Sequence, residues 1–374
     1  MFVPVSQPLL GANERKYVKR AIDRGEISGL SGDYIAQFES AFAKFCGVKH
    51  AIMVNSGTTA LHLAVAALDI GPGDEVLVSS FTMMATFFAV MYQGATPVPI
   101  DSERGTLNID PSLIEAKITK KTKAIIVVHI YGHPVDMDPI MKIARKHNLV
   151  VIEDGAEAHG ATYKGKKVGS LGHIGCFSFY SNKIVTTGEG GGITTNDSAL
   201  DKKIRLIKNL SFGEKNKFMH QGLGFKYQMT NLQAAVGAGQ MTHIDDIVKR
   251  KRKMGEIYLK GLKDVPYIEL PREEKYAKNV YWMFNIILIG PLSGKREVFM
   301  SELKKRGIDT REDFVPFNQQ TVFIKQGLTK PTDCPVVNSF YQDGFYLPSG
   351  TLISKKEQSY VIKHVKEVVK LLTQ

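Results

Sequence analysis

The sequence predicts an α/β protein of two domains, in which a mostly parallel sheet fills the larger N-terminal domain. The chain has 374 residues, more than one ordinary domain holds. Hydrophobic residues make up 43% and charged residues 23% of it, which is the balance of a globular protein and excludes collagen-like, coiled-coil and disordered classes. Over about the first two-thirds of the chain, short β-branched runs alternate with longer helical patterns, and this alternation is typical of βαβ units.

Each predicted strand is a short apolar run, and each predicted helix shows apolar residues at helical spacing. Strands are expected at 50–54, 75–78, 96–100, 123–129, 149–153 and 175–180, with a further β-prone run at 192–195. Helices are expected at 58–68, 137–147, about 230–262, and 355–372, the last packed on a smaller sheet. We place the domain boundary at residue 245, so that 1–245, with an N-terminal arm, form the larger domain and 246–374 the smaller C-terminal α+β domain.

Charge and cysteine usage bound the functional classes. The chain has 49 Lys and Arg against 37 Asp and Glu, a net charge of +12, and its one dense basic run, 249–253, lacks the interleaved aromatic residues of a single-strand binder. We therefore expect this run to be a solvated helix face and expect no nucleic-acid partner, although a basic nucleic-acid-binding or regulatory protein remains the non-enzyme alternative. The three cysteines are far apart and odd in number, so we expect buried thiols rather than disulfides or a zinc site. No apolar run reaches the length of a membrane helix and no leader is visible, so we expect a cytoplasmic protein without a membrane partner.

The first candidate site is Asn55–Thr59, which joins the strand at 50–54 to the next helix. Backbone N–H groups at the start of a helix have no partner within the helix and bind anions. The alternative is an ordinary helix cap by Ser56 or Thr58.

The second candidate site is Glu153–Gly160, which begins directly after the apolar run LVVI at 149–152. A carboxylate at this position is half-buried and suits the protonated nitrogen of a heterocyclic cofactor. Two alternatives stay open here: a helix cap by Asp154, and metal ligation by Asp154, Glu157 and His159.

The third candidate site is the most specific: a packed aromatic strand, one lysine at Lys183, and a glycine-dense turn. A poorly hydrated lysine has a lowered pKa and readily forms a Schiff base with a carbonyl cofactor, although a single exposed loop lysine would be unremarkable. The glycines at 188–192 precede a strand and lack the GxGxxG spacing, which excludes a nicotinamide or flavin site.

A fourth segment, His129–Pro134, also follows a strand. Its glycine and proline predict a loop lining the cleft and argue against a metal shared by its two histidines.

The segments SGTTAL, EDGAEAHG, FSFYSNKIVTTGEGG and YQMTNLQAA, in this order, resemble the DegT/DnrJ/EryC1/StrS sugar aminotransferases. The resemblance covers nearly the whole chain and includes GPGDEV, VHIYGHPVDMDPI and GIDTREDFVPF. It implies the type I aspartate aminotransferase fold, with a mostly parallel seven-stranded sheet, and pyridoxal 5′-phosphate (PLP) as cofactor, with the pyridoxamine form as intermediate.

The resemblance also implies a role for individual residues. Lys183 would bind the cofactor covalently and carry the proton, and Asp154 would pair with the pyridinium nitrogen. Glu157 would lie near the phenolic oxygen, and Asn231 would reach the cofactor phosphate of the other subunit, which makes the active unit a homodimer with composite sites. The remaining cofactor contacts implied are Ser56, Gly57, Thr58 and Ser178. Candidate substrate contacts are His129, Tyr131, His133, Arg311 and Asn318. No metal is implied.

Three positions depart from the family pattern. Met83 stands where relatives place an aromatic ring that stacks on the pyridine, Gln228 where they have arginine, and Asn318 where they often have histidine. A thioether can pack on a ring face, more loosely than an aromatic ring does. The changes at 228 and 318 leave the cofactor set intact but bear on contacts with the sugar or the nucleotide.

VHIYGHP and the Asn-Lys pair before TTGEGG look most like family members that aminate C4 of a GDP-linked 4-keto-6-deoxy sugar. The resemblance thus implies transfer of nitrogen from L-glutamate to a nucleotide-diphospho keto sugar, with release of 2-oxoglutarate, in O-antigen or other polysaccharide biosynthesis. A UDP- or dTDP-linked substrate (viosamine type) and amination at C3 remain alternatives. A related C3 dehydratase has histidine in place of the lysine, and Lys183 argues against it.

Overall fold

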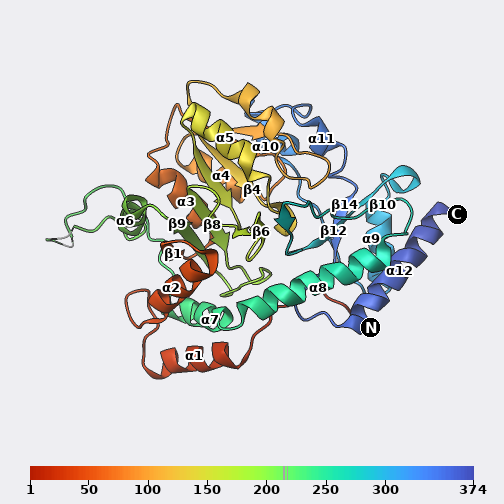
Figure 1. The fold of residues 1–374 in the computed structure, drawn as a ribbon, viewed down its shortest axis with the longest axis horizontal. Coiled ribbons are helices and arrows are strands. Elements are labelled where there is room, and N and C mark those ends of the chain that lie inside the picture. Colours follow the sequence, from red (N-terminus) through yellow and green to blue (C-terminus); the bar gives the residue numbers. More distant parts are fainter. Residues whose placement is uncertain (214, 217) are drawn as a thin grey trace.

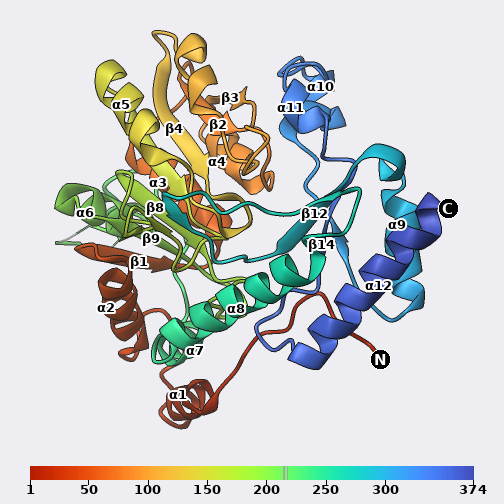
Figure 2. The ribbon, with the colours of Figure 1, turned by 45° about the vertical axis from the view of Figure 1, so that its right-hand side comes forward.

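The computed structural model describes residues 1–213, 215–216 and 218–374, and a seven-stranded sheet lies at the centre of its larger part (Figures 1 and 2). Its strands, in the spatial order β1-β9-β8-β5-β4-β2-β3, are β1 His50–Val54, β9 Gly191–Thr195, β8 Ile174–Ser178, β5 Val150–Asp154, β4 Thr122–Val128, β2 Glu75–Ser79 and β3 Thr96–Ile100. The pairs β2–β3, β2–β4, β4–β5 and β5–β8 are parallel, whereas β9 pairs antiparallel with β8 and with β1. The predicted mostly parallel sheet is confirmed, and each of its strands lies within two residues of the predicted bounds.

Helices pack on this sheet because successive residues of a strand point to opposite faces. On β4, Ile126 packs into one apolar cluster, whereas Ile125 and Val127 pack into another. The helices of this part are α1 Ala12–Asp23, α2 Tyr34–Cys46, α3 Gly57–Ala67, α4 Ala85–Tyr92, α5 Met137–His147 and α6 Ser198–Ile207. The helices predicted at 58–68 and 137–147 are therefore confirmed as α3 and α5.

A second, antiparallel sheet of four strands forms the smaller part, in the order β10-β12-β14-β13. Its strands are β10 Ile268–Glu269, β12 Phe284–Leu288, β14 Gly344–Leu347 and β13 Arg311–Glu312, and the helices of the second half are α7 Asn231–Met241, α8 Ile244–Leu262, α9 Arg296–Lys305, α10 Thr321–Lys325, α11 Pro335–Asn338 and α12 Lys355–Thr373. A small three-stranded sheet joins β6 Thr162–Tyr163 and β7 Lys166–Lys167 to β11 Ala277–Lys278. In the described part of the chain, no helix is long and apolar enough to cross a membrane.

The helix predicted at 230–262 is two helices, α7 and α8, because the chain breaks at Thr242 and His243. His243 has a non-helical backbone (φ −139°, ψ 24°), and its Nε2 lies 2.8 Å from Oε1 of Glu14. Asn13 donates from Nδ2 to the hydroxyl of Thr242 at 2.9 Å. Contacts with α1 thus accompany the break, and the spacing of apolar residues in the sequence does not reveal these contacts. Figure 1 shows α8 running from α7 toward α12.

The prediction that the basic run 249–253 is a solvated helix face is wrong at Lys251. This side chain is only 2% exposed, and its Nζ donates to the backbone carbonyls of Trp282, at 2.9 Å, and Ser349. Burial lowers the pKa of Lys251 to about 7. Its helical position faces inward, toward the segment that precedes β12, and the two carbonyls replace the water that an ammonium group otherwise binds.

Packing crosses the predicted domain boundary at residue 245, which itself stays a prediction. Val3 is buried in the core of the smaller sheet and forms a parallel bridge with Ile308. In the opposite direction, Phe317 stacks on Phe87 of α4 with the ring centroids 4.1 Å apart. The N-terminal arm therefore packs with the second part, and the segment after β13 packs with the first.

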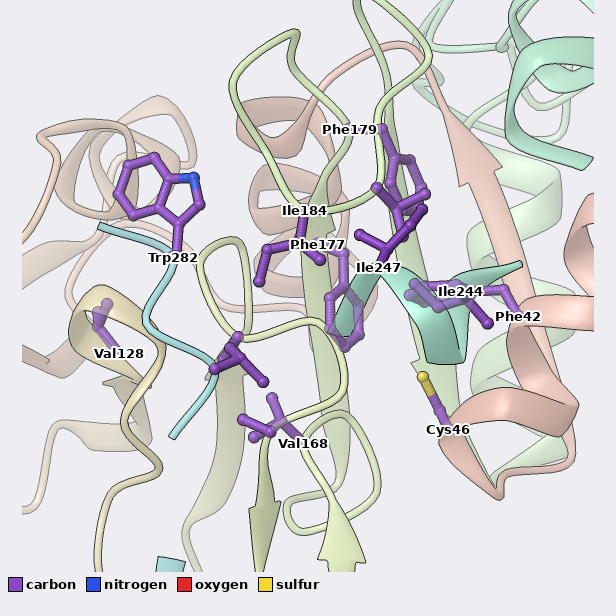
Figure 3. Packing of buried hydrophobic residues seen from close by; sticks show 14 of the residues in the cluster. Phe42, Cys46, Val128, Val168, Phe177, Phe179, Ile184, Ile244, Ile247 and Trp282 are labelled. Atoms are coloured by element: carbon purple, nitrogen blue, oxygen red, sulfur yellow. The ribbon is translucent and has the colours of Figure 1, made fainter. Parts of the chain in front are cut away.

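The largest apolar cluster of the described residues includes Ile184, the neighbour of the predicted lysine (Figure 3). It contains Phe177 and Phe179 around β8, Ile184 just beyond Lys183, and Trp282 from the segment before β12. The three cysteines, Cys46, Cys176 and Cys334, are free and buried, as predicted.

Candidate functional site

A cavity of about 370 Å³ opens where β5 and β8 end and α3 begins. In an α/β sheet, ligands bind beyond the carboxyl ends of the strands. Eight of the nine predicted cofactor contacts line this cavity: Ser56, Gly57, Thr58, Met83, Asp154, Glu157, Ser178 and Lys183. The predicted cofactor contacts that line the cavity therefore come from segments up to 127 residues apart in the sequence, from Ser56 to Lys183.

The N-terminus of α3 has the free donors that an anion site needs. Ser56 is the N-cap, and its hydroxyl accepts the N–H of Thr59 at 3.1 Å. The cap leaves the N–H groups of Gly57 and Thr58 without a backbone or side-chain partner among the described residues, at the positive end of the helix dipole. Both interpretations of this segment hold together, because one hydroxyl caps the helix while the neighbouring amides face the cavity.

Gly57 is required by close packing at this point. A Cβ added to Gly57 would lie 2.7 Å from Cβ of Ser178. A residue larger than glycine would therefore fill the space between the helix N-terminus and the Ser178 hydroxyl. This cradle has the donors and the size for a phosphate group.

Asp154 ends β5 and is 5% exposed. Its Oδ2 accepts the hydroxyl hydrogen of Thr86 at 2.8 Å, and its Oδ1 accepts the N–H of Ala156 at 3.2 Å. Burial raises the pKa of this carboxyl above its ordinary value, although the two hydrogen bonds oppose the shift. In the described residues no ion pair joins this buried carboxyl to another side chain, and such a group is suited to a cationic group of a ligand.

Lys183 lies on the turn between β8 and β9, and burial lowers the pKa of its amine below the ordinary value. Glu157 and Asp154 act in the opposite direction, because their negative charges stabilise the ammonium form. Glu157 is 4% exposed and accepts the backbone N–H of Tyr131 at 2.6 Å, and burial raises the pKa of its carboxyl. The site thus holds an amine of lowered pKa together with two carboxyls of raised pKa, and groups that exchange protons are arranged in this way.

Met83 is 58% exposed and lines the cavity. The side chain is therefore not part of the core under the strand end. An exposed apolar side chain at the mouth of a cavity is a surface that a bound ring can cover.

Asn231, the ninth predicted cofactor contact, does not line the cavity of its own chain. It is fully buried, its Oδ1 accepts the N–H of Tyr34 at 3.1 Å, and its Nδ2 donates to the carbonyl of Glu26 at 2.6 Å. Its predicted role, contact with the other subunit's cofactor, involves a chain beyond this one and stays a prediction.

The five predicted substrate contacts, His129, Tyr131, His133, Arg311 and Asn318, do not line the cavity either. His129 is fully buried, and both of its ring nitrogens have partners. Its Nε2 lies 3.1 Å from Oε2 of Glu153, and its Nδ1 accepts the N–H of Val135 at 3.0 Å. Asn318 is also fully buried and donates to Asn338 at 2.9 Å. Both side chains are therefore buried and hydrogen-bonded within this chain, and their contacts with substrate stay predictions.

The other three predicted substrate contacts lie elsewhere. Tyr131 and His133 line a separate cavity of about 220 Å³, where the Tyr131 hydroxyl donates to Asp313 at 3.0 Å. Burial lowers the pKa of His133 to about 4, so its ring is neutral at pH 7. Arg311 is exposed and pairs with Asp309 at 2.6 Å.

The described side chains do not form the metal sites considered as alternatives at 153–160 and 129–134. His159 is fully buried and stacks on Phe179 with the ring centroids 5.6 Å apart, and neither ring nitrogen has a hydrogen-bond partner. In the described residues, no group of three or more histidine, cysteine or acidic side chains is placed to hold a metal ion.

Several residues that line the cavity were not among the predicted contacts, including Thr86, Phe314, Tyr346 and Trp282. The last three follow the predicted domain boundary, and no local motif marks them. Trp282 carried one signal, because it is the single tryptophan of the chain.

The donor set fits a cofactor with a phosphate group, a protonated ring nitrogen and a carbonyl carbon. The α3 N-terminus with the Ser178 hydroxyl, buried Asp154, and the amine of Lys183 each supply one of the three matching partners, around one cavity.

Comparison with known proteins agrees with this set of groups. The model of the DegT/DnrJ/EryC1/StrS aminotransferase family matches residues 8–366. The GDP-perosamine synthase of Caulobacter vibrioides is 42% identical over 368 residues, 98% of each chain, and that of Escherichia coli O157:H7 is 39% identical over 366 residues, also 98% of each chain. A solved structure of Spr1654 from Streptococcus pneumoniae in its PLP form superposes with a TM-score of 0.94 at 26% identity and covers 100% of both chains.

Proposed function

The chain belongs to the DegT/DnrJ/EryC1/StrS aminotransferase family and is a PLP-dependent aminotransferase, and on that premise we propose how its residues act and on which substrate. The observation that carries the proposal is that one cavity holds a helix N-terminus, the buried carboxyl of Asp154 and the amine of Lys183. These are the groups that PLP chemistry requires.

When bound, PLP supplies an electron sink for the carbon that loses a proton. The N–H groups of Gly57 and Thr58 and the hydroxyl of Ser178 would bind its phosphate. Asp154 would hold a proton on the ring nitrogen, and the hydroxyl of Thr86 fixes the orientation of this carboxyl through the 2.8 Å hydrogen bond.

Lys183 would attach the cofactor, and its free amine would then carry the proton between the substrate carbon and C4′ of the cofactor. Its lowered pKa increases the fraction of neutral amine at pH 7, the form that accepts a proton. Glu157, placed by the N–H of Tyr131, would lie near the phenolic oxygen of the cofactor. Its raised pKa favours a protonated carboxyl that can donate a hydrogen bond there.

The proposed reaction moves the amino group of L-glutamate to C4 of a GDP-linked 4-keto-6-deoxyhexose and releases 2-oxoglutarate. The similarity to two GDP-perosamine synthases over 98% of the chain supports this substrate class. The product would serve O-antigen or other polysaccharide biosynthesis, and a relative from Bacillus subtilis, 36% identical, is named for spore coat polysaccharide biosynthesis.

We further propose a homodimer with composite sites. Asn231 begins α7 and is held rigidly by Tyr34 and Glu26. Asn231 lies outside its own cavity, and the proposal that it serves the other subunit rests on the match of YQMTNLQAA to the family. A reducing compartment suits three free cysteines, so we propose that the enzyme works in the cytoplasm.

The test is a panel of GDP-, UDP- and dTDP-linked 4-keto-6-deoxyhexoses, each incubated with L-glutamate and the holoenzyme. Product mass and NMR report whether an amine has formed and on which carbon. We expect amination at C4 with the GDP-linked substrate, with Lys183→Ala as inactive control. Amination at C3, or a clear preference for UDP or dTDP, would replace the proposed substrate and leave the aminotransferase assignment in place.

A further inference from the structure

The amine of Lys183 lies on the face of an indole ring. Its Nζ is 3.6 Å from the centroid of the Trp282 ring. No hydrogen bond or ion pair joins this Nζ to another group in the described ranges 1–213, 215–216 and 218–374. The indole is therefore the direct partner of the amine when no ligand is bound.

Trp282 is held in place from three sides and is 4% exposed. Its Nε1 donates to the carbonyl of Asn182 at 2.8 Å, and its backbone N–H donates to the carbonyl of Tyr131 at 2.9 Å. Its own carbonyl accepts from Nζ of Lys251 at 2.9 Å. Asn182 directly precedes Lys183, so the indole is hydrogen-bonded to the backbone next to the lysine and its face also contacts the amine.

This placement suits a cation. The face of an indole attracts an ammonium group, and the attraction is stronger where water is excluded. Asp154 and Glu157 favour the ammonium form by charge, while burial disfavours it. A hydroxyl or carbonyl at the same position would instead form a directional hydrogen bond, which the amine must break each time it moves.

We propose that Trp282 is a positioning residue whose indole face holds the free amine of Lys183 inside the cavity whenever the lysine is not covalently attached to the cofactor. The inference rests on the role of Lys183 in the proposed function. A lysine side chain has four rotatable bonds and a large rotamer entropy. A flat, apolar partner limits this freedom without forming a bond that has to be broken before the amine carries a proton.

The single tryptophan makes the contact measurable without any activity assay. An ammonium group on the face of an indole quenches its fluorescence, because the excited ring accepts a proton. The full-length protein freed of cofactor should therefore show weak emission at neutral pH and a rise in emission as Lys183 loses its proton. Because the pKa of Lys183 is lowered, the midpoint should lie below the ordinary lysine value of about 10.4.

Other titrating groups near the amine or the indole have to be separated from Lys183. Those that face the amine are Asp154 and Glu157, and those packed around Trp282 and its neighbours are Lys251, Tyr131, Tyr346 and Asp313. Lys251 is the matched control, because it is the other buried lysine that contacts Trp282, but at the carbonyl rather than at the ring. The experiment compares wild type, Lys183→Met and Lys251→Met from pH 6 to pH 10.5, with melting temperatures as a check of folding.

We expect Lys183→Met to emit more strongly than wild type at pH 6 and to lose the rise in emission with pH, and we expect Lys251→Met to keep that rise. Wild-type emission and pH profile in Lys183→Met would overturn the proposal, as would loss of the rise only in Lys251→Met. If Lys183→Met fails to fold, a flat wild-type profile from pH 6 to pH 10.5 overturns it equally.

The same Lys183→Met protein separates this inference from the proposed function. Covalent attachment of PLP is read from the visible absorbance of the cofactor. Attachment that persists in Lys183→Met would refute the catalytic role of Lys183, whereas the fluorescence reports only whether its amine lies on Trp282.

Discussion

Replacement of Met83 tests whether its side chain covers one face of the cofactor ring. Met83 lines the cavity and is 58% exposed in the structure without ligand. Full burial of a methionine side chain is worth about 1.5–3 kcal/mol, so covering the exposed 58% stabilises the complex by about 1–2 kcal/mol. Met83→Ala should therefore weaken binding of pyridoxamine phosphate by about 5- to 30-fold.

The pyridoxamine form is the right probe because it binds without attachment to Lys183, so its dissociation constant reports noncovalent contacts alone. Met83→Phe should bind the cofactor as tightly as wild type or more tightly, because a ring offers a larger stacking surface. The Phe variant should also melt like wild type, since an exposed position has room for the larger side chain. Leu371→Ala, which truncates a side chain of similar exposure (51%) on α12, is the matched control and should leave the dissociation constant unchanged. An unchanged dissociation constant for Met83→Ala would refute the reasoning and would mean that another side chain covers the face of the cofactor ring.

Four further predictions follow from the site and its surroundings. Lys183→Ala should fold and bind cofactor noncovalently but lose at least about 10²–10⁴-fold in turnover, and turnover within tenfold of wild type would move the role to another lysine. Asp154→Asn can still accept the Thr86 hydroxyl hydrogen, so its melting temperature should change little while most activity is lost; unchanged kinetics and cofactor spectrum would remove Asp154 from its role. A mixture of inactive Lys183→Ala and Asn231→Ala subunits should regain part of the activity, because each mixed dimer has one intact site, and a fully active monomer would contradict the composite site. Lys251 has a pKa of about 7 in the folded chain against 10.5 ordinarily, so between these values the folded chain binds fewer protons than the unfolded chain. The unfolding free energy of the wild type should therefore rise with pH in that window, by up to about 1.4 kcal/mol per pH unit relative to Lys251→Met. Parallel pH profiles of the two unfolding free energies would contradict this prediction.

Local patterns sufficed to predict the sheet and the cofactor side of the cavity. The strands at 50–54 and 149–153 are short apolar runs, and the polar groups that follow them meet because parallel strands end at one edge of the sheet. Gly57, Asp154 and Lys183 each lie in such a segment. The resemblance to a family then gave each of them its role.

The contacts that depend on distant segments could not be predicted in this way. The break between α7 and α8 involves side chains of α1, more than 200 residues away. Lys251 looks like one member of a solvated basic run until the carbonyls of Trp282 and Ser349 are seen around it. The burial of His129 against Glu153 likewise needs the pairing of β4 with β5, which brings residues 24 positions apart into contact.

The identity of the lysine that holds the cofactor tests the central claim most directly. Borohydride reduction of the holoenzyme fixes the cofactor covalently to its lysine, and mass spectrometry of the digested protein identifies the peptide that carries it. Among the described residues, the rival lysines are Lys208 and Lys251, because burial also lowers the pKa of each. We predict that the label is found on Lys183 and on neither rival, whereas a label on Lys208, on Lys251 or on no lysine would contradict the assignment of this cavity as the active site.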